Sequence, residues 1–322
     1  MTNKNILVTG GAGFIGGHFV DLLMEKEKSS SSKIVVLDKL TYAARPERLT
    51  QFKSDPRFEF ITGDICDEIS TAKVMSDFNI EVVVNFAAES HVDNSLIDAY
   101  PFMKTNVEGV RSLLNVCLRQ HVEMFVQIST DEVYGQGYGG HLFTETDPYR
   151  PRNPYSSSKV EAEKLVKSYC DTSSLKYLIT RGCNSFGPWQ HSEKLIPKVI
   201  LNALSHKKVP IYGRGDQKRE WIAAVDHAGA VLHLLSTGYQ NEVFNIGSGY
   251  EVENINVVKR ILNELGKPES LITYVEDRLN HDYKYGVNTS KIKCAGWKPS
   301  KTFHPYLIKT INHYKHIKKQ GI

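Results

Sequence analysis

The chain has 322 residues, of which 41% are hydrophobic and 24% charged, so it holds enough apolar material for a buried core and is not a disordered segment. Lysine and arginine number 40 against 36 aspartate and glutamate, and the resulting net charge of +4 gives no reason to expect a nucleic acid or an anionic membrane as partner. The longest apolar runs, such as residues 82–88, are too short to cross a bilayer, and no leader pattern opens the chain, so we expect a cytoplasmic protein.

Apolar runs of strand length alternate with amphipathic stretches of helical length over about the first 180 residues. The apolar runs are continuous in Val and Ile, which indicates strands covered on both faces, as in a parallel sheet. Sustained strand–helix alternation predicts an α/β fold of the Rossmann-like, doubly wound kind. The expected strands are 5–9, 33–38, 58–62, 82–87, 124–130 and 176–180, and the expected helices are 15–25, 69–78, 105–119 and 154–169.

Prolines and glycines interrupt shorter elements in the rest of the chain, where we expect a strand at 242–246 and helices at 194–205 and 257–265. The pattern therefore predicts a first domain over residues 1–182 and a smaller C-terminal lobe over 183–322. The boundary is soft, because in such folds the chain can re-enter the first domain.

Three glycines, Gly10, Gly13 and Gly16, lie between the first expected strand and the first expected helix. A phosphate approaches the backbone only where side chains are absent, and a helix that begins there offers free N–H groups and a positive dipole end. Asp38 closes the next strand, 22 residues after Gly16. An acidic side chain at that place accepts hydrogen bonds from a ribose 2′-OH and repels a 2′-phosphate, so NAD(H) is expected and not NADP(H).

Two basic side chains near this turn, Lys39 and Arg45, argue in the other direction, since they could neutralise a 2′-phosphate. Asp64 follows the third expected strand, where it could face the adenine of the cofactor. An equally good interpretation of Asp64 is a helix cap for the segment that follows.

Tyr155 and Lys159 are four residues apart, so on a helix they share one face. An ammonium next to a phenol favours the phenolate, which can deprotonate an alcohol as its hydride leaves. The spacing alone is common on helix surfaces and gains meaning from the glycine turn before it. Asp131 and Glu132 directly follow the expected strand 124–130. They therefore lie at the sheet edge where open α/β folds hold their ligands. Two carboxylates there supply the acid and base that elimination requires and a simple alcohol oxidation does not.

At these residues the chain resembles the nucleotide-sugar dehydratases of the extended short-chain dehydrogenase/reductase group, and among them the dTDP-glucose 4,6-dehydratases. The resemblance extends over nearly the whole chain. The acidic pair distinguishes it from sugar epimerases of the same group, which usually carry small or hydroxyl residues there. The segments that carry the resemblance are 9–16, 63–65, 85–95, 105–106, 129–135, 153–159, 181–197, 210–213, 244–248 and 277–285.

The resemblance implies a lyase that converts an NDP-hexose, with dTDP-glucose expected, into its 4-keto-6-deoxy form. Tyr155, assisted by Lys159 and Thr130, would take the proton of the 4-hydroxyl while hydride passes from C4 to tightly bound NAD. Glu132 would then remove the C5 proton while Asp131 protonates the departing C6 hydroxyl, and hydride would return to C6.

The resemblance also implies residue roles in binding. Those expected to bind NAD are Gly10, Gly13, Phe14, Ile15, Gly16, Asp38, Lys39, Thr41, Asp64, Ile65, Ala87, Ala88, Tyr155 and Lys159. Those expected to bind the nucleotide sugar are Ser90, Thr105, Thr130, Asn184, Lys194, Leu195, Pro210, Tyr212, Arg219, Asn254, Arg278, His281 and Tyr285.

The chain departs from the usual family pattern at Gln217, Glu220 and Lys284, where Asn, Asp and Arg are common. These positions belong to the nucleotide end of the expected site, so a UDP-sugar remains an alternative substrate. A 4-epimerase is the alternative reaction. A regulator that senses nucleotides on the same fold would need neither the dyad nor the acidic pair.

The family also implies a homodimer in which the helices 105–119 and 154–169 of each subunit form a four-helix bundle. Their apolar residues are Val107, Val110, Leu114, Val160, Leu165 and Val166, and the sequence equally allows these residues to pack on the sheet. The five cysteines, Cys66, Cys117, Cys170, Cys183 and Cys294, are scattered and form no CxxC pair, so neither a disulfide framework nor a metal site is expected. An inert buried thiol and a reactive nucleophile both remain open for them.

Overall fold

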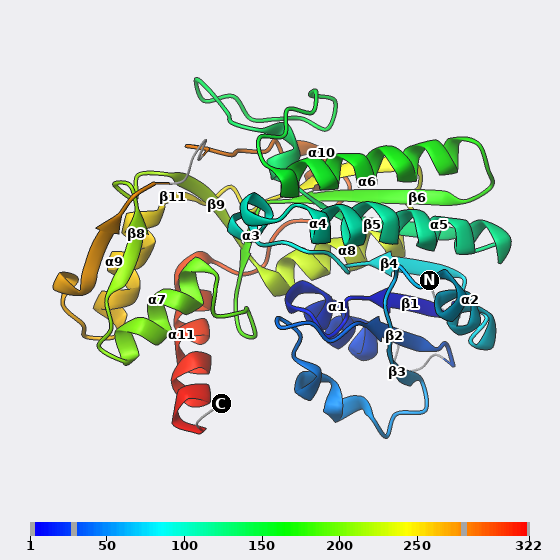
Figure 1. Ribbon diagram of the computed structural model, residues 1–322, viewed down its shortest axis with the longest axis horizontal. Coiled ribbons are helices and arrows are strands. Elements are labelled where there is room, and N and C mark those ends of the chain that lie inside the picture. The colour runs from blue at the N-terminus through cyan, green and yellow to red at the C-terminus, as the bar shows by residue number, and fades with distance from the viewer. Residues whose placement is uncertain (1–3, 27–30, 278–281, 321–322) are drawn as a thin grey trace.

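A seven-stranded parallel sheet organises the computed structural model, which describes residues 4–26, 31–277 and 282–320 (Figure 1). The strand order is β10-β6-β5-β4-β1-β2-β3, with every neighbouring pair parallel. The bounds are β1 Ile6–Thr9, β2 Ile34–Asp38, β3 Phe58–Thr62, β4 Val82–Asn85, β5 Met124–Thr130, β6 Lys176–Gly182 and β10 Glu242–Ile246. The doubly wound α/β fold predicted from the alternation is thus confirmed.

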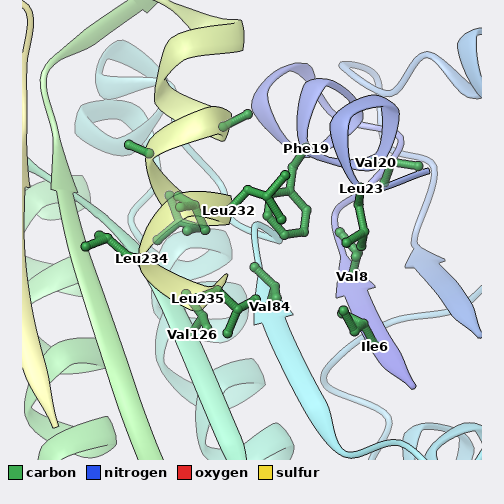
Figure 2. Close-up of a cluster of buried hydrophobic side chains, with 14 of the residues drawn as sticks. Ile6, Val8, Phe19, Val20, Leu23, Val84, Val126, Leu232, Leu234 and Leu235 are labelled. Atoms are coloured by element: carbon green, nitrogen blue, oxygen red, sulfur yellow. The ribbon is translucent and has the colours of Figure 1, made fainter. Parts of the chain in front are cut away.

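Helices cover both faces of this sheet. On one face α1 (Phe14–Lys26) and α8 (Ala224–Thr237) pack against it, and Figure 2 shows their side chains meeting those of β1, β4 and β5. On the other face lie α2 (Glu68–Asp77), α5 (Gly109–Arg119) and α6 (Pro154–Asp171). The continuous Val/Ile runs of the central strands are buried because both faces are covered.

A second group of elements packs around its own core and lies to the left in Figure 1. It contains a three-stranded sheet, β11-β9-β7, and a two-stranded sheet, β12-β8. The bounds are β7 Asn184–Phe186, β8 Val209–Tyr212, β9 Lys218–Ala223, β11 Glu251–Glu253, β12 Ile272–Val275, α7 Leu195–Leu204, α9 Asn254–Glu264 and α11 Phe303–Gln320. Between this group and the large sheet, the carboxyl ends of β5 and β6 continue directly into the segments that carry the site.

Short helical segments complete the chain. They are η1 Pro46–Phe52, α3 Val92–Ile97, α4 Tyr100–Met103, the π-helical turn η2 Lys104–Glu108, η3 Asp131–Tyr134, η4 Glu269–Leu271 and α10 Ser290–Cys294. The expected helix 105–119 therefore consists of the π-helical turn followed by α5. Residues 224–246 follow the predicted boundary at residue 182, yet α8 and β10 pack with the large sheet.

The apolar residues considered for a dimer face are mostly buried within the subunit. Val110, Leu114 and Val166 belong to the core beneath α5 and α6, and Val160 is packed in a smaller core beside η3. Packing within the subunit, the alternative that the sequence left open, therefore accounts for these four side chains.

Candidate active site

The glycine turn after β1 leaves no room for side chains. Gly10 has a positive φ of 67°, and a Cβ built on it would lie 2.5 Å from the Ala87 nitrogen. A Cβ on Gly16 would lie 2.3 Å from the Gly10 carbonyl oxygen. Because α1 begins at Phe14, its free N–H groups face the space that these glycines keep open. The turn therefore fits the pyrophosphate of a dinucleotide.

Asp38, at the end of β2, stabilises the same turn through both carboxylate oxygens. Its Oδ2 accepts a hydrogen bond from the Ala12 N–H at 2.9 Å, and its Oδ1 accepts one from the Leu40 N–H at 2.8 Å. Burial raises the pKa of the Asp38 carboxyl, while these two N–H groups act in the opposite direction. The carboxylate is held at the edge of the cleft, where a ribose would be expected.

Lys39 and Arg45, the two basic residues that could neutralise a 2′-phosphate, are bound to other groups of the protein. The Lys39 Nζ forms an ion pair with the Asp64 Oδ2 at 2.6 Å, and an Arg45 Nη1 donates to the Ala44 carbonyl. Asp64 does not cap the next helix, because the N-cap of α2 is Asp67, whose side chain accepts from the Ser70 N–H. The cap interpretation of Asp64 was therefore wrong, and its carboxylate lines the cleft together with Lys39.

A cleft of about 330 Å³ runs from the glycine turn to the end of β5. It is lined by every residue predicted to bind NAD, from Gly10 directly after β1 to Lys159 on α6. The catalytic residues predicted at the end of β5, Thr130, Asp131 and Glu132, line the same cleft, as do the substrate residues Ser90, Thr105, Asn184 and Lys194. The structure thus brings the expected cofactor and catalytic residues together in one space.

Tyr155 and Lys159 lie in the first two turns of α6, which begins with a capping box formed by Asn153 and Ser156. Both side chains are buried. The Lys159 Nζ donates to the Ile128 carbonyl at 2.6 Å, and burial lowers the pKa of Lys159 to about 8. Burial raises the pKa of Tyr155, as do the charges of Glu132 and Asp131, whereas a hydrogen bond with Thr130 lowers it.

Burial and the charges of Glu132 and Asp131 therefore work against the phenolate form of Tyr155, whereas we expected Lys159 to favour it. The Lys159 ammonium itself is bonded to the Ile128 carbonyl.

Asp131 and Glu132 point into the site from η3. The Asp131 carboxyl is buried, and its Oδ2 has no hydrogen-bond partner among the described residues. Burial raises its pKa well above the usual value, reinforced by Glu132 and Glu220. The Glu132 Oε2 accepts a hydrogen bond from the Asn153 Nδ2 at 3.2 Å, and the pKa of Glu132, also raised by burial, is lowered in part by this bond. One carboxyl thus favours its acid form, and the other has a donor that supports its charged form.

A second cleft of about 410 Å³ adjoins the first and shares Ser90, Glu132, Asn184 and Lys194 with it. Nine of the predicted substrate residues line it, namely Ser90, Asn184, Lys194, Leu195, Pro210, Tyr212, Arg219, Asn254 and Tyr285. The buried Oδ1 of Asn254 has no hydrogen-bond partner among the described residues. Arg278 and His281 lie outside the described residues.

The predicted cationic residues of this second cleft already hold backbone carbonyls. The Lys194 Nζ donates to the Ser90 carbonyl at 2.9 Å, and Arg219 donates to the carbonyls of residues 282 and 283. The guanidinium of Arg219 lies 4.6 Å from the centre of the Tyr285 ring, whose hydroxyl donates to the Asp282 Oδ2 at 2.7 Å. These contacts place two positive charges beside the wall that carries Glu132.

Sequence reasoning missed several residues of the site. Asn153 belongs to the segment 153–159 that resembles the family, but no role was predicted for it. An Asn before Pro154 is nevertheless a typical N-cap signature. His227 lines the first cleft from α8, a helix that was not expected, and its Nδ1 lies 2.9 Å from the Ser185 Oγ. Gln190 and Glu193 line both clefts from the loop before α7.

The site therefore combines a dinucleotide-shaped turn with a Tyr/Lys dyad, an acid and a base. The chain belongs to the NAD dependent epimerase/dehydratase family, which it matches over residues 6–247. The predicted NAD dependence and family resemblance are thereby confirmed.

The chain is also similar to individual proteins over nearly its whole length. The chain is 46% identical to the low-salt glycan biosynthesis protein Agl12 of Haloferax volcanii, over 96% of this chain and 98% of that protein. It is 43% identical to a dTDP-glucose 4,6-dehydratase of Neisseria gonorrhoeae, over 97% and 95% of the two chains. Among solved structures, DesIV, a dTDP-glucose 4,6-dehydratase from Streptomyces venezuelae with NAD and TYD bound, matches with a TM-score of 0.94 at 38% identity, over 98% of each chain.

Two further findings concern the described residues alone. None of their helices has the length and apolar character needed to span a membrane. They contain no group of three or more His, Cys, Asp or Glu side chains arranged to hold a metal ion.

Proposed function

We propose that this protein is an NAD-dependent hydro-lyase that dehydrates dTDP-glucose to the 4-keto-6-deoxy sugar. The observation that carries the proposal is that Asp131 and Glu132 line the same cleft as Tyr155. An epimerase of the same family needs the tyrosine but has no use for an additional acid–base pair. Relatives that bear the name dTDP-glucose 4,6-dehydratase, at 38–43% identity, support the same reaction.

The first step is oxidation at C4. When bound, NAD supplies the hydride acceptor and later the hydride donor. Tyr155 accepts the proton of the 4-hydroxyl, and the Thr130 hydroxyl, which hydrogen-bonds with it, orients the phenol. The Lys159 ammonium, one turn further along the same helix, stabilises the phenolate form of Tyr155 that accepts this proton.

Elimination follows because the C4 ketone acidifies the hydrogen on C5. Glu132 removes that proton, and Asn153 fixes the carboxylate for the purpose. Asp131 gives its proton to the C6 hydroxyl, which leaves as water. A proton then returns to C5 as the hydride returns to C6, which completes the 4-keto-6-deoxy sugar. The raised pKa of Asp131 suits this role, since the acid form must be present at neutral pH.

The nucleotide end of the substrate is assigned to the second cleft. Lys194 and Arg219 supply positive charge for the diphosphate, and Asn254 offers an acceptor without a partner among the described residues. Gln217, where relatives usually carry Asn, lines this cleft and donates to the Asp277 Oδ2 at 2.9 Å. The substituted side chain therefore has a partner in this wall. Support for dTDP as the carrier comes from the relatives named dTDP-glucose 4,6-dehydratase and from DesIV, which was solved with TYD bound.

The test is incubation of the purified protein with NAD and either dTDP-glucose or UDP-glucose, followed by mass spectrometry. A product lighter than its substrate by one water, formed faster from dTDP-glucose, is the expected result. A product of unchanged mass would mean epimerisation, and faster conversion of UDP-glucose would move the assignment to a UDP-sugar. The matched control is Tyr155→Phe, which removes the acceptor of the first proton.

We infer a homodimer and a cytoplasmic location as the setting of this activity. Three large apolar side chains at the end of α3 and in α4 are exposed: Ile97 at 85%, Tyr100 at 68% and Met103 at 42%. Such a group on a surface helix suits contact with a second subunit. Sedimentation of the wild type and of a Tyr100→Glu variant tests this, and a monomeric wild type would contradict it.

A further inference from the structure

A buried ion pair lies behind the catalytic dyad. Arg181 on β6 and Glu163 on α6 are 1% and 0% exposed at their side chains, and an Arg181 Nη2 lies 2.8 Å from the Glu163 Oε2. The Arg181 Nε lies 3.1 Å from both carboxylate oxygens. Hydroxyl groups complete the arrangement: Tyr134 accepts from Arg181, and Tyr149 accepts from Arg181 and donates to Glu163.

This ion pair is connected to the active site along two routes. Along α6, Tyr155, Lys159 and Glu163 follow one another at intervals of four residues and share one face. Across to β5, the Ser129 Oγ donates to the Glu163 Oε1 at 2.6 Å. Ser129 stands directly after Ile128, whose carbonyl accepts from the Lys159 Nζ, and directly before Thr130.

Such a pair is not explained by stability alone. Replacing a buried ion pair with apolar side chains of similar volume is often neutral or stabilising, because both charges must give up their water. Here every polar atom of Glu163 and Arg181 has a partner, and the partners come from β5, β6, η3 and the segment before α6. The pair therefore fixes the position of α6 on the end of the sheet.

The charge of Glu163 also acts on the dyad. Burial lowers the pKa of Lys159, and the Glu163 carboxylate raises it. Other titratable groups that line the cleft around the dyad are Tyr155 on α6, Asp131 and Glu132 on η3 and His227 on α8. Among these neighbours, Glu163 is the one whose charge opposes the effect of burial on Lys159.

We propose that Glu163, anchored by Arg181, is a positioning residue that sets the placement of Lys159 and Tyr155 and keeps Lys159 in its ammonium form. This role rests on the proposed function, since C4 oxidation is the step that uses the dyad. Glu163 touches neither substrate nor cofactor in this role and acts through Lys159.

The experiment isolates C4 oxidation by placing Glu163→Gln in a Glu132→Gln background, where the reaction stops after the first step. The rate of NADH formation with dTDP-glucose is measured against pH. Without the Glu163 charge the pKa of Lys159 falls, so the alkaline loss of rate is expected about one pH unit lower, with little change in KM. Glu163→Asp, which retains the charge, is expected to restore the pH profile at a reduced rate.

Glu161→Gln is the matched control, because it removes the same charge from the exposed side of α6. A Glu163→Gln profile that superimposes on that of the parent, or an equal shift in Glu161→Gln, would overturn the proposal. If Glu163→Gln does not fold, Ser129→Ala takes its place, since it removes the bond between β5 and Glu163 and keeps both charges. Its expected effect is a slower oxidation at unchanged KM, and an unchanged rate would overturn the positioning role.

A second readout separates this proposal from the proposed function. In protein labelled with 15N at the lysine side chains, the Lys159 ammonium signal, assigned with Lys159→Gln, titrates without any substrate. A lower pKa of Lys159 in Glu163→Gln is expected even if dTDP-glucose proves not to be the substrate. An unchanged pKa overturns the charge role, while a missing reaction in the wild type overturns only the function.

Discussion

Asn153 joins the start of α6 to Glu132. Its Nδ2 donates to the Glu132 Oε2 at 3.2 Å, and its Oδ1 accepts from the Ser156 N–H at 2.8 Å. One amide thus caps the helix that carries Tyr155 and holds the carboxylate that is proposed to deprotonate C5. The two proton acceptors of the reaction are placed relative to each other by a single side chain.

Asn153→Ser separates these two duties. Serine is nearly as good an N-cap as asparagine, so the free energy of unfolding is expected to change by less than about 1 kcal/mol. Serine is too short to reach Glu132, so elimination is expected to slow by roughly tenfold to a hundredfold while C4 oxidation is retained. Single-turnover measurements of NADH formation and decay distinguish the two steps. Equal slowing of both steps would show that Asn153 acts on the helix alone.

Glu132→Gln removes the base and leaves the dyad intact. C4 oxidation is expected to proceed and then stop, so NADH accumulates on the enzyme and elimination falls by about 10²–10⁴-fold. The measurement is an absorbance rise at about 340 nm, a property of the reduced nicotinamide, without release of the 4-keto-6-deoxy product. Normal turnover in this variant would assign the C5 proton to another group.

The sheet was predictable because its strands are mostly continuous apolar runs, and three of them, 58–62, 124–130 and 242–246, have the predicted bounds. Helix α8 was missed because its buried positions extend around much of its circumference, so it lacks a polar stripe. The π-helical turn at 104–108 was also missed, because no residue pattern predicts a turn that is wider than that of an α-helix.

The site was predictable where local spacing carries the chemistry, as at Tyr155 and Lys159. It was not predictable where tertiary contacts determine which side chains meet. The ion pair between Lys39 and Asp64 joins the ends of two strands, and the bond from Asn153 to Glu132 joins the N-cap of α6 to η3. Burial is the largest cause of the raised pKa of Tyr155, and no sequence spacing reports burial.

Asp131→Asn is expected to stabilise the protein increasingly as pH rises. The pKa of Asp131 is raised in the folded state above its unfolded value of 3.8. Such a group contributes its full stability below the unfolded pKa, and that contribution is lost as pH rises toward the folded pKa, at up to about 1.4 kcal/mol per pH unit. Asparagine does not titrate. The melting temperatures of variant and wild type should therefore be close near pH 4 and diverge toward pH 8, and a constant difference would contradict the raised pKa.

Gly16→Ala tests whether the glycine turn holds the cofactor. The added Cβ would lie 2.3 Å from the Gly10 carbonyl oxygen, a backbone atom that cannot move aside without distorting the turn. We expect the purified variant to carry little NAD and to lose about 1–3 kcal/mol of stability. Gly229→Ala in α8 is the matched control, because the nearest atom to its Cβ would be the Leu22 Cδ1 at 3.9 Å, an ordinary contact. That variant should keep its NAD and gain about 0.4–1 kcal/mol. Full NAD content in Gly16→Ala, measured by release of cofactor from the denatured protein, would place the pyrophosphate elsewhere.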